Sequence, residues 1–366
     1  MNFIINREEL LLPLQQIVSV IEKRQTMPIL SNLLIVVNDN ALQLTGTDLE
    51  IQLVAKINLD LAEDGSITVP ARKFLDIIRL LPNQSEIKIE LKDNKIKVTS
   101  GRSRFSLSTL PAENYPEFSE STFENHFFIN AGKMKKALDK TTFCMANQDI
   151  RYYLNALLFH ISNSKLKLVA SDGHRLSIYE DSIGEATGYE SKIILPRKGI
   201  LELARLLDDD EAELNIQFSN SNIKIFFKNM IFSAKLVDSK YPDFSKVFDQ
   251  TFFNQIHIQK HLLKDALTRV AVLANEKFKG VTCEISDGLL KLSSHNPEHD
   301  EAEEELVIEY QGESISIAFN SQYLLDAVSN LDSELAVLTI ASNSSSCFVE
   351  EPEQQLYKFI VMPMRL

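Results

Sequence analysis

The side chains that could do chemistry together most readily are Asp172 and His174, two residues apart in an Asp-Gly-His triplet. A carboxylate beside an imidazole is half of a general acid–base pair, and Asp48 is a candidate third member. However, GxSxG, HExxH and glycine-rich phosphate-loop motifs are absent, and the chain has only 11 glycines. Asp48 and Asp172 are also equivalent in a repeat described below, which is typical of aspartates that shape turns. We expect no enzyme, with a hydrolase using Asp172 and His174 as an alternative.

Cysteine usage and composition exclude several other classes. Cys144, Cys283 and Cys347 lie far apart without a CxxC pair, so we expect reduced thiols in a cytoplasmic protein, no metal site and no cofactor. Hydrophobic residues make up 44% and charged residues 24%, an ordinary globular balance. The sequence has no signal peptide pattern and no run of eighteen apolar residues, so we expect no membrane contact.

An internal repeat organises the chain. The segment TVPARKFLDIIRLL at 68–81 returns as ILPRKGILELARLL at 194–207 and more faintly as AFNSQYLLDAVSNL at 318–331, at spacings of 126 and 124. Asp48 and Asp172 are 124 residues apart as well. A period of this length is that of a whole domain rather than of a solenoid module. The sequence therefore predicts three tandem copies of one domain, at 1–122, 123–250 and 251–366.

Each copy has the same predicted order of elements, and together they need six helices. A helical segment comes first, alternating strand-like runs follow, and a second helix opens after Pro or Asn before further strands. This order predicts α+β domains with helices on one side of antiparallel sheet. The expected helices are 6–24, 71–81, 132–145, 196–207, 260–277 and 320–331.

Positive charge gathers in these predicted helices although the chain has a net charge of −13. They hold 17 Lys and Arg against 9 Asp and Glu, while the three copies carry net charges of −3, 0 and −10 in order. Exposed helix faces favour lysine and arginine in any case, but they favour glutamate equally. The segregation therefore favours an electropositive surface for phosphate contact without base reading, since no recognition helix or zinc finger is present.

Geometry indicates what such a surface could surround. Two chains joined head to tail would contribute twelve helices, which at a spacing of about 9 Å form a circle about 35 Å across. About 25 Å would stay free inside, enough for B-DNA of about 20 Å. One chain alone would close too small a ring. The acidic last copy facing Arg102 and Arg104 of the first copy favours head-to-tail order.

At this point the sequence resembles a known family, the beta subunit of bacterial DNA polymerase III, or beta sliding clamp. The likeness extends from the first residue to the last. It rests on TVPARKF, GRSRFSLSTLPAENYPEF, QDIRYYLNALLF, ASDGHRL, PRKGILELARLL, NEKFKGV, HNPEHDEAEEE and VMPMRL.

The resemblance implies a head-to-tail homodimeric ring with helices lining the hole. It also implies an ATP-driven clamp loader that places the ring on duplex DNA of any sequence. A pocket between the second and third domains would bind short linear motifs of the replicative polymerase, the loader, other polymerases and repair proteins.

Three sets of site residues follow from the resemblance. The DNA contacts would be Arg24, Arg72, Lys73, Gln148, Tyr152, Tyr153, Arg197 and Lys198. The peptide pocket would be Leu154, Ser171, Gly173, His174, Arg175, Leu176, Pro242, Val247, Tyr323, Ile360, Val361, Met362, Pro363, Met364 and Arg365. The subunit seam would be Arg102, Arg104, Phe105, Leu107, Val272, Leu273, Glu298, Glu301, Glu303 and Glu304.

The residues themselves support the pocket modestly. An apolar tail containing methionine is unusual for an exposed chain end, and methionine adapts to varied peptides; a last strand tucked into the core explains it equally well. Two departures from the family pattern bear on the sites. Asn147 stands where a histidine is often expected, and Ser344, Ser345 and Ser346 are polar for a pocket wall.

A scaffold of three like domains that does not bind DNA stays a second alternative function for the chain.

Overall fold

The computed structural model describes residues 1–22, 27–118, 122–184, 187–208, 211–248, 254–341 and 346–365. The first copy contains β1 (Asn2–Asn6), α1 (Arg7–Val20), β2 (Asn32–Asn38), β3 (Ala41–Thr47), β4 (Ile51–Asn58), β5 (Ala62–Glu63), β6 (Gly65–Pro70), α2 (Ala71–Leu80), β7 (Glu86–Lys92), β8 (Lys95–Ser100) and β9 (Ser103–Ser108). The second contains β10 (Asn125–Asn130), α3 (Ala131–Thr141), β11 (Ala156–Ser162), β12 (Lys165–Ser171), β13 (Arg175–Ser182), β14 (Glu190–Pro196), α4 (Arg197–Leu206), β15 (Glu213–Phe218), β16 (Asn222–Phe227) and β17 (Met230–Lys235). The third contains β18 (Asn254–Gln259), α5 (Lys260–Val270), β19 (Gly280–Ser286), β20 (Leu289–His295), β21 (Glu301–Val307), β22 (Ile315–Asn320), α6 (Ser321–Ser329), β23 (Leu335–Ile340), β24 (Cys347–Glu350) and β25 (Tyr357–Val361).

The predicted repeat is confirmed by the element spacing. The strands β2, β11 and β19 begin 124 residues apart, and so do β3, β12 and β20. Apart from the two-residue β5, the three copies have the same order of strands and helices in the described part of the chain. The fold class, α+β with three copies of one helix-plus-antiparallel-sheet domain, is therefore the one that the sequence predicts.

The six predicted helices are also confirmed, with earlier ends at several places. The segment expected as 260–277 is helical only through Val270 and tightens into a 3-10 turn at Ala271–Leu273. The chain then turns because the Asn275 side chain accepts the backbone N–H groups of Lys277 and Phe278 at 3.0 and 3.1 Å. An asparagine that bonds the backbone ahead of it in this way favours a turn over further helix.

The chain separates into two compact units, each of which holds half of the middle copy. Unit 1 is Met1–Lys135 with Leu201–Asp238, and unit 2 is Lys136–Ile200 with Ser239–Leu366. Sheet pairing defines these units, whereas the domain limits expected at 122 and 250 describe sequence copies and stay a prediction.

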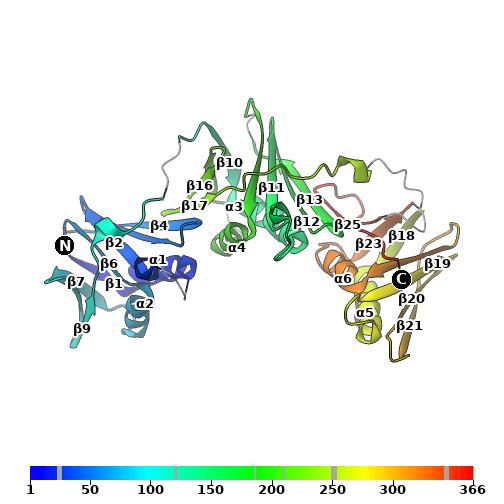
Figure 1. The fold of residues 1–366 in the computed structure, drawn as a ribbon, viewed down its shortest axis with the longest axis horizontal. Coiled ribbons are helices and arrows are strands. Elements are labelled where there is room, and N and C mark those ends of the chain that lie inside the picture. The colour runs from blue at the N-terminus through cyan, green and yellow to red at the C-terminus, as the bar shows by residue number, and fades with distance from the viewer. Residues whose placement is uncertain are drawn as a thin grey trace. The chain divides into compact units, whose positions relative to one another are not determined.

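Unit 1 contains a five-stranded sheet, β5-β1-β7-β8-β9, and an eight-stranded sheet, β10-β15-β16-β17-β4-β3-β2-β6. The second sheet crosses from one copy to the next where β17 pairs with β4, from Met230 opposite Ala55 to Ala234 opposite Ile51. Helix α1 packs against α2 in this unit (Figure 1). The buried residues of α2 recur at helical spacing, and its outward face carries Arg72 and Lys73.

Unit 2 contains an eight-stranded sheet, β14-β11-β12-β13-β25-β24-β23-β18, and a four-stranded sheet, β21-β20-β19-β22. Here the copies join where β13 pairs with β25, from Arg175 opposite Val361 to Tyr179 opposite Tyr357. Helices α5 and α6 pack together in this unit (Figure 1). The strands β4, β13 and β21 are equivalent in the three copies, and so are β9, β17 and β25. Strand β4 pairs with β17 and β13 pairs with β25, whereas β21 and β9 each lie at the edge of a sheet.

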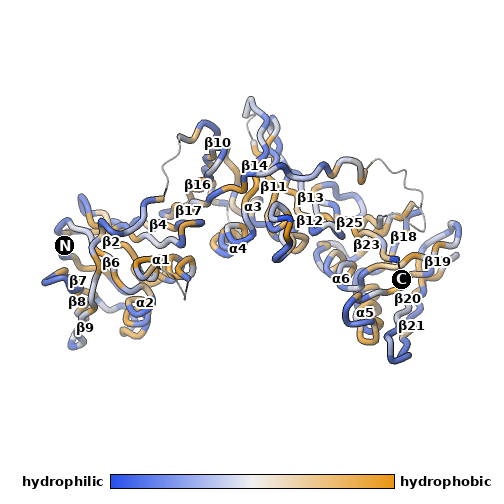
Figure 2. The backbone as a smooth tube through the Cα atoms, viewed as in Figure 1, coloured by the Kyte–Doolittle hydropathy of each residue, from blue (hydrophilic) through white to orange (hydrophobic). Residues whose placement is uncertain are grey.

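The cores are apolar layers between sheets and helices, and Figure 2 shows hydrophobic stretches in strands and helices with hydrophilic turns between them. Within the described ranges, no helix combines the length and apolar character needed to cross a bilayer. In the same part of the chain, no group of three or more His, Cys, Asp or Glu side chains is arranged to hold a metal ion.

Candidate functional site

The Asp-Gly-His segment forms a tight turn between β12 and β13. One carboxylate oxygen of Asp172 accepts the backbone N–H groups of His174 and Arg175 at 2.9 and 3.0 Å, and the other accepts Nε of Arg175 at 3.0 Å. In the first copy, Asp48 accepts the N–H groups of Glu50 and Ile51 in the same way, at 2.9 and 2.8 Å. Both aspartates therefore shape turns, as their repeat positions predict, and the geometry gives no support to an acid–base pair at Asp172.

Gly173 lets this turn approach a neighbouring loop closely. Its φ of +90° is left-handed, and an added Cβ would lie 3.0 Å from a guanidinium nitrogen of Arg151. The same guanidinium donates to the carbonyl oxygen of Asp172 at 3.3 Å. Arg151 closes a short 3-10 turn by accepting the N–H of Leu154 at 2.8 Å. The predicted pocket residue Leu154 is therefore held beside the Asp172 turn.

Arg175 connects the second copy to α6 of the third. Its guanidinium bonds Asp172 on one side and reaches Asp326 at 2.5 Å on the other. The same group lies 4.5 Å from the centre of the Tyr323 ring and 5.7 Å from that of Phe143. Burial alone would lower the pKa of Arg175, but the Asp326 and Asp172 carboxylates favour the charged form and raise it. Arg175 is therefore a half-buried side chain that is ion-paired with two carboxylates, rather than a free cation.

The C-terminal tail lies beside Arg175 and His174. Strand β25 places Val361 and Ile360 opposite Arg175 and Leu176, and the N–H of Met362 then donates to the carbonyl of His174 at 2.8 Å. The ring of His174 stacks on Tyr323 with centroids 6.3 Å apart.

Beyond β25, the tail joins another sheet. The N–H of Met364 donates to the carbonyl of Ala318 in β22 at 2.7 Å. Met362 is 42% exposed, and its sulfur lies 3.0 Å from the hydroxyl of Ser346. Ser346 is therefore a polar neighbour of the tail, while Ser344 and Ser345 lie outside the described residues. An exposed methionine on a fixed tail is available to an incoming ligand.

The segment between the second and third copies supplies the remaining predicted pocket residues. Burial of the phenol raises the pKa of Tyr241, and the Ser171 backbone opposes that rise. The equivalent Tyr115 of the first copy donates to the carbonyl of Thr45 at 3.2 Å. Pro242 follows as an exposed residue and Val247 as a half-buried one.

The predicted pocket residues thus cluster within unit 2, on the Asp172 turn, β13, β25, the tail and the segment after Tyr241. Arg151 and Asp326 are central to this cluster and were not predicted. The motif QDIRYYL contains Arg151 together with four predicted site residues, Gln148, Tyr152, Tyr153 and Leu154, but no local pattern in the sequence indicates that Asp326 reaches Arg175.

The predicted DNA residues Arg72 and Arg197 have the same contact in two copies. Each lies in the first turn of the second helix and donates to a carbonyl at the end of the first helical segment, Arg72 to Ile21 at 3.0 Å and Arg197 to Met145 at 3.1 Å. A guanidinium there satisfies a carbonyl that the helix leaves open. Both arginines therefore have a structural role, which leaves the adjacent, exposed Lys73 as a cleaner charge probe than Arg72.

The loop before β11 brings three other predicted DNA residues together within unit 2. Gln148 is exposed with a φ of +61°, and Tyr152 and Tyr153 meet edge to face with ring centroids 6.1 Å apart. Arg151 hydrogen-bonds to the Asp149 carboxylate and lowers the pKa of Asp149 to about 2. The loop thus presents polar and aromatic groups on a fixed turn, beside an exposed Asn147. Arg24 lies outside the described residues.

The predicted seam residues belong to the first and third copies, where they lie on or beside the edge strands β9 and β21 and in the 3-10 turn Ala271–Leu273. Arg102, Arg104 and Phe105 are exposed at or beside β9, and Leu107 is half-buried. In the third copy, Val272 is 76% exposed and Leu273 half-buried.

The acidic seam residues are partly engaged with nearby cations. Glu304 on β21 pairs with Arg269 at 2.6 Å, and Glu303 pairs with Lys291 at 2.8 Å. Glu298 and Glu301 are exposed. Leu80, at the end of α2, is 84% exposed, whereas its repeat equivalent Leu206 is buried, so it is a seam candidate that sequence reasoning missed.

The three cysteines are all buried free thiols. Burial raises the pKa of Cys283 to about 12 and raises the pKa values of Cys144 and Cys347 as well. Buried thiols of this kind are unreactive, which agrees with the expectation of reduced cysteines.

Comparisons with known proteins extend over the whole chain. Family models of the DNA polymerase III beta subunit match its N-terminal domain at 1–119, its central domain at 128–243 and its C-terminal domain at 245–365. The beta sliding clamps of Pseudomonas aeruginosa and Escherichia coli are each 43% identical over 367 residues, covering 100% of both chains.

Solved structures agree with these matches. A crystal structure of the DNA polymerase sliding clamp from Pseudomonas aeruginosa with ligand superposes with a TM-score of 0.98 at 42% identity, covering 100% of both chains. Pol III beta of Caulobacter crescentus superposes with a TM-score of 0.94 at 31% identity, again over 100% of both chains.

Proposed function

Because the chain belongs to the DNA polymerase III beta subunit family, we propose that it works as a DNA sliding clamp. Two chains close head to tail around duplex DNA, and the ring tethers the replicative polymerase as a processivity factor. Full-length relatives named beta sliding clamp, and a polymerase sliding clamp structure with ligand, support this function. The clamp loader, other polymerases and repair proteins would use the same groove through short linear motifs.

The observation that carries the proposal is the pair of edge strands β9 and β21. Wherever two copies meet within the chain, the strand equivalent to β21 pairs with the strand equivalent to β9, as β4 does with β17 and β13 with β25. Only the first copy's β9 and the third copy's β21 lack that pairing among the described strands. A second chain supplies both missing partners at once, and repeating the junction head to tail closes a ring.

The internal junctions also predict the register of the seam. Glu301 on β21 lies opposite a residue of β20, and the equivalent residues of β3 and β12 lie opposite Gln52 and Leu176. Glu301 is therefore the repeat equivalent of Gln52 and Leu176. Ser106 likewise corresponds to Ser233, which lies opposite Gln52. We therefore place Ser106 opposite Glu301 of the partner subunit.

Counting outward from that pair sets Arg104 opposite Glu303 of the partner subunit. Opposite charges placed directly across a strand pair stabilise it, and like charges destabilise it. This register agrees with the expectation that acidic residues of the third copy meet arginines of the first.

A charge exchange tests the seam. The change Arg104→Glu should weaken the dimer, because a glutamate would then face the Glu303 carboxylate of the partner subunit. The double change Arg104→Glu with Glu303→Arg should restore it. Sedimentation velocity at nanomolar protein measures both, with Lys95→Glu on the neighbouring β8 as a matched control. A dimer unaffected by Arg104→Glu, or a double variant as weak as the single one, would show that β9 and β21 do not meet in this register.

The DNA surface consists of side chains from the second helices and the loop before β11. Lys73 and Lys198 supply charge in the first turns of α2 and α4, where backbone N–H groups also favour phosphate. Arg72 and Arg197 keep donors free beyond their carbonyl contact, since a guanidinium carries five. Gln148, Tyr152 and Tyr153 complete the surface, which binds phosphates without reading sequence.

The peptide groove is formed by the Asp172 turn, β13 and the tail. The exposed Pro242 and half-buried Val247 offer apolar contacts opposite Met362 and the residues after it, while Leu176 is mostly buried in the unit. Burying two apolar anchors there contributes about 3–6 kcal/mol before ordering costs, which suits micromolar binding. Weak binding lets several partners exchange on one ring. The clamp would do no chemistry, because Asp172 is engaged in its turn and with Arg175.

A further inference from the structure

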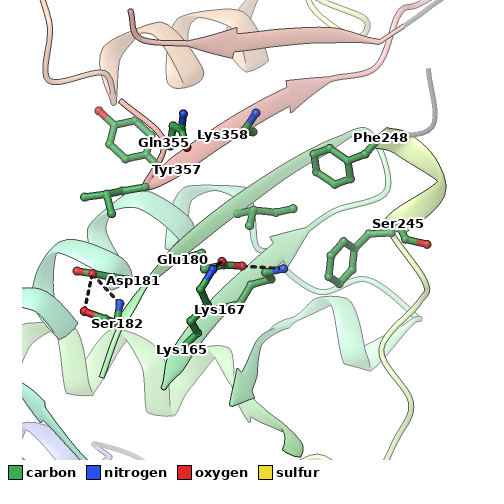
Figure 3. A pocket seen from close by; sticks show the side chains of 13 residues that line it. Lys165, Lys167, Glu180, Asp181, Ser182, Ser245, Phe248, Gln355, Tyr357 and Lys358 are labelled. Carbon is green, nitrogen blue, oxygen red and sulfur yellow. Dashed lines mark hydrogen bonds and ion pairs between the residues drawn. The ribbon is translucent and has the colours of Figure 1, made fainter. Parts of the chain in front are cut away.

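A second hollow lies in unit 2, beside the proposed peptide groove. It encloses about 770 Å³ between β12, β13, the segment around Phe244 and Phe248, and the residues leading into β25 (Figure 3). Its apolar lining includes Ile178, Phe244, Phe248 and Leu356. The ring of Phe248 is itself fixed edge to face on Phe348, with centroids 5.7 Å apart. A hollow of this size and lining can hold an aromatic or large aliphatic side chain.

The rim of the hollow is rich in lysine. Lys165 and Lys167 reach the same carboxylate, Glu180, at 2.7 and 2.8 Å (Figure 3). Asp181 also lines the hollow, so its lining holds three lysines, Lys165, Lys167 and Lys358, against two carboxylates. Lys358 is paired with Glu350 at 2.9 Å in an exposed ion pair that contributes little. The lining therefore keeps one positive charge in excess on a chain whose net charge is −13.

The hollow continues the groove along one sheet face. Leu176 and Ile178 on β13 project to the same side, since they are two residues apart, and their partners across the ladder are Ile360 and Lys358 on β25. Leu176 and Ile360 belong to the proposed groove, whereas Ile178 and Lys358 line or rim the hollow. About four residues of extended chain, at about 3.3 Å each, bridge the distance from Leu176 to Glu180.

We propose that this hollow is a second docking site, which binds the segment of a partner protein that flanks its groove-bound motif. The segment has one aromatic or large aliphatic side chain, which enters between Phe244, Phe248 and Ile178. Acidic residues beside it meet Lys165 and Lys358. This proposal rests on the proposed groove, and it makes recognition bipartite: the groove binds the common apolar motif, and the hollow ranks partners by their flanking sequence. Joining two weak contacts on one peptide raises affinity without a stronger motif.

Fluorescence anisotropy with the full-length protein tests the proposal. The short probe is a labelled QLxLF-type pentapeptide. Two long probes extend it by Gly-Glu-Phe-Glu-Asp at the amino or the carboxyl end, and two further probes carry lysine in place of each acidic residue. One of the acidic long probes should bind roughly five- to tenfold tighter than the short probe, while its lysine counterpart gains nothing.

The double variant Lys165→Gln with Lys358→Gln should remove that gain and leave the affinity for the short probe unchanged. Lys192→Gln, an exposed lysine on β14 of the same sheet, is the matched control and should preserve the gain. Phe244→Ala is an independent variant that should reduce the gain by shrinking the apolar lining.

The outcomes separate the two sites. Equal affinity for the short probe and both acidic probes would overturn the hollow but leave the groove standing, and a gain that survives the double lysine variant would also overturn it. If the short probe fails to bind while an acidic long probe binds in a lysine-dependent manner, the groove is wrong and the hollow is right. If neither kind of probe binds, both sites are wrong.

Discussion

At the scale of single residues, several charged side chains serve the fold as well as a surface. Arg72 and Arg197 each satisfy a carbonyl where a first helical segment ends, and Arg175 spans two carboxylates between copies. Replacing any of them would disturb local structure as well as charge, since a buried partner loses its bond. The exposed Lys73 lies beside Arg72 and is better suited to test the surface charge alone.

Neutralising Lys73 should weaken DNA binding without harming the fold, because this side chain is exposed. We predict that Lys73→Gln lowers the salt dependence of binding to duplex DNA, by about one in log–log slope for the phosphate that is no longer neutralised. Titrations of labelled duplex at several salt concentrations measure the slope. Affinity for a QLxLF-type peptide is the control and should stay constant. A parallel fall in peptide affinity, or an unaltered salt slope, would contradict the separation of the two surfaces.

The turn aspartates show what sequence could predict at this scale and what it could not. Asp48 and Asp172 were recognisable because both stand at one repeat position and a side chain bonding its own backbone is a local event. The partner of Arg175 was not, because Asp326 is 151 residues away and its approach depends on how β13 pairs with β25. Glu304 was assigned to the seam, yet in the single chain it pairs with Arg269.

At the scale of elements, apolar periodicity predicted all six helices, but their ends depended on side-chain bonds. The segment after α5 tightens into a 3-10 turn and is then turned by the bonds of Asn275, and Leu80 at the end of α2 is 84% exposed where Leu206 is buried. The proposed pairing of β9 and β21 with another chain could not be read from alternation alone, because edge and inner strands alternate alike. Comparison of the three structural copies is what identifies these two strands as each having one open edge.

Truncating the apolar residues of the proposed seam should weaken the association of the two subunits. We predict that Val272→Ala with Leu273→Ala costs about 2–4 kcal/mol of association free energy, because these side chains lose their burial against the partner. Sedimentation at nanomolar concentration should then show folded monomers. The equivalent double change Leu262→Ala with Leu356→Ala, which also removes exposed apolar groups, should leave the dimer intact. A dimer that persists in the first variant would place the seam elsewhere.

Deleting the C-terminal tail, residues 362–366, should abolish peptide binding without unfolding the protein. Strand β25 ends at Val361, so deleting residues 362–366 leaves its ladder intact and removes the backbone bonds of Met362 to His174 and of Met364 to Ala318. Each bond contributes about 1 kcal/mol, so the protein should stay folded and dimeric with a modest loss of thermal stability. Calorimetry with a QLxLF-type peptide should show no binding, and processive synthesis should no longer be stimulated. Undiminished peptide binding would place the groove elsewhere.

At the scale of the whole molecule, the three copies provide both repetition and asymmetry. The proposed ring repeats the same junction head to tail between two chains, and the positive helices α2 and α4 of a chain with net charge −13 favour its contact with DNA. The sequence repeat and the charge segregation made this architecture predictable. The compact units were not predictable, because each forms by strand pairing across the sequence copies.

Topological retention tests the central claim most directly. Protein loaded on a nicked circular duplex by its clamp loader is washed at a salt concentration that removes electrostatic binders, and the circle is then cut once with a restriction enzyme. Retention on DNA is measured before and after the cut by gel filtration. A closed ring should stay on the circle through the wash and leave once the DNA has ends. Equal loss from circular and linear DNA during the wash, or continued retention after the cut, would contradict the account.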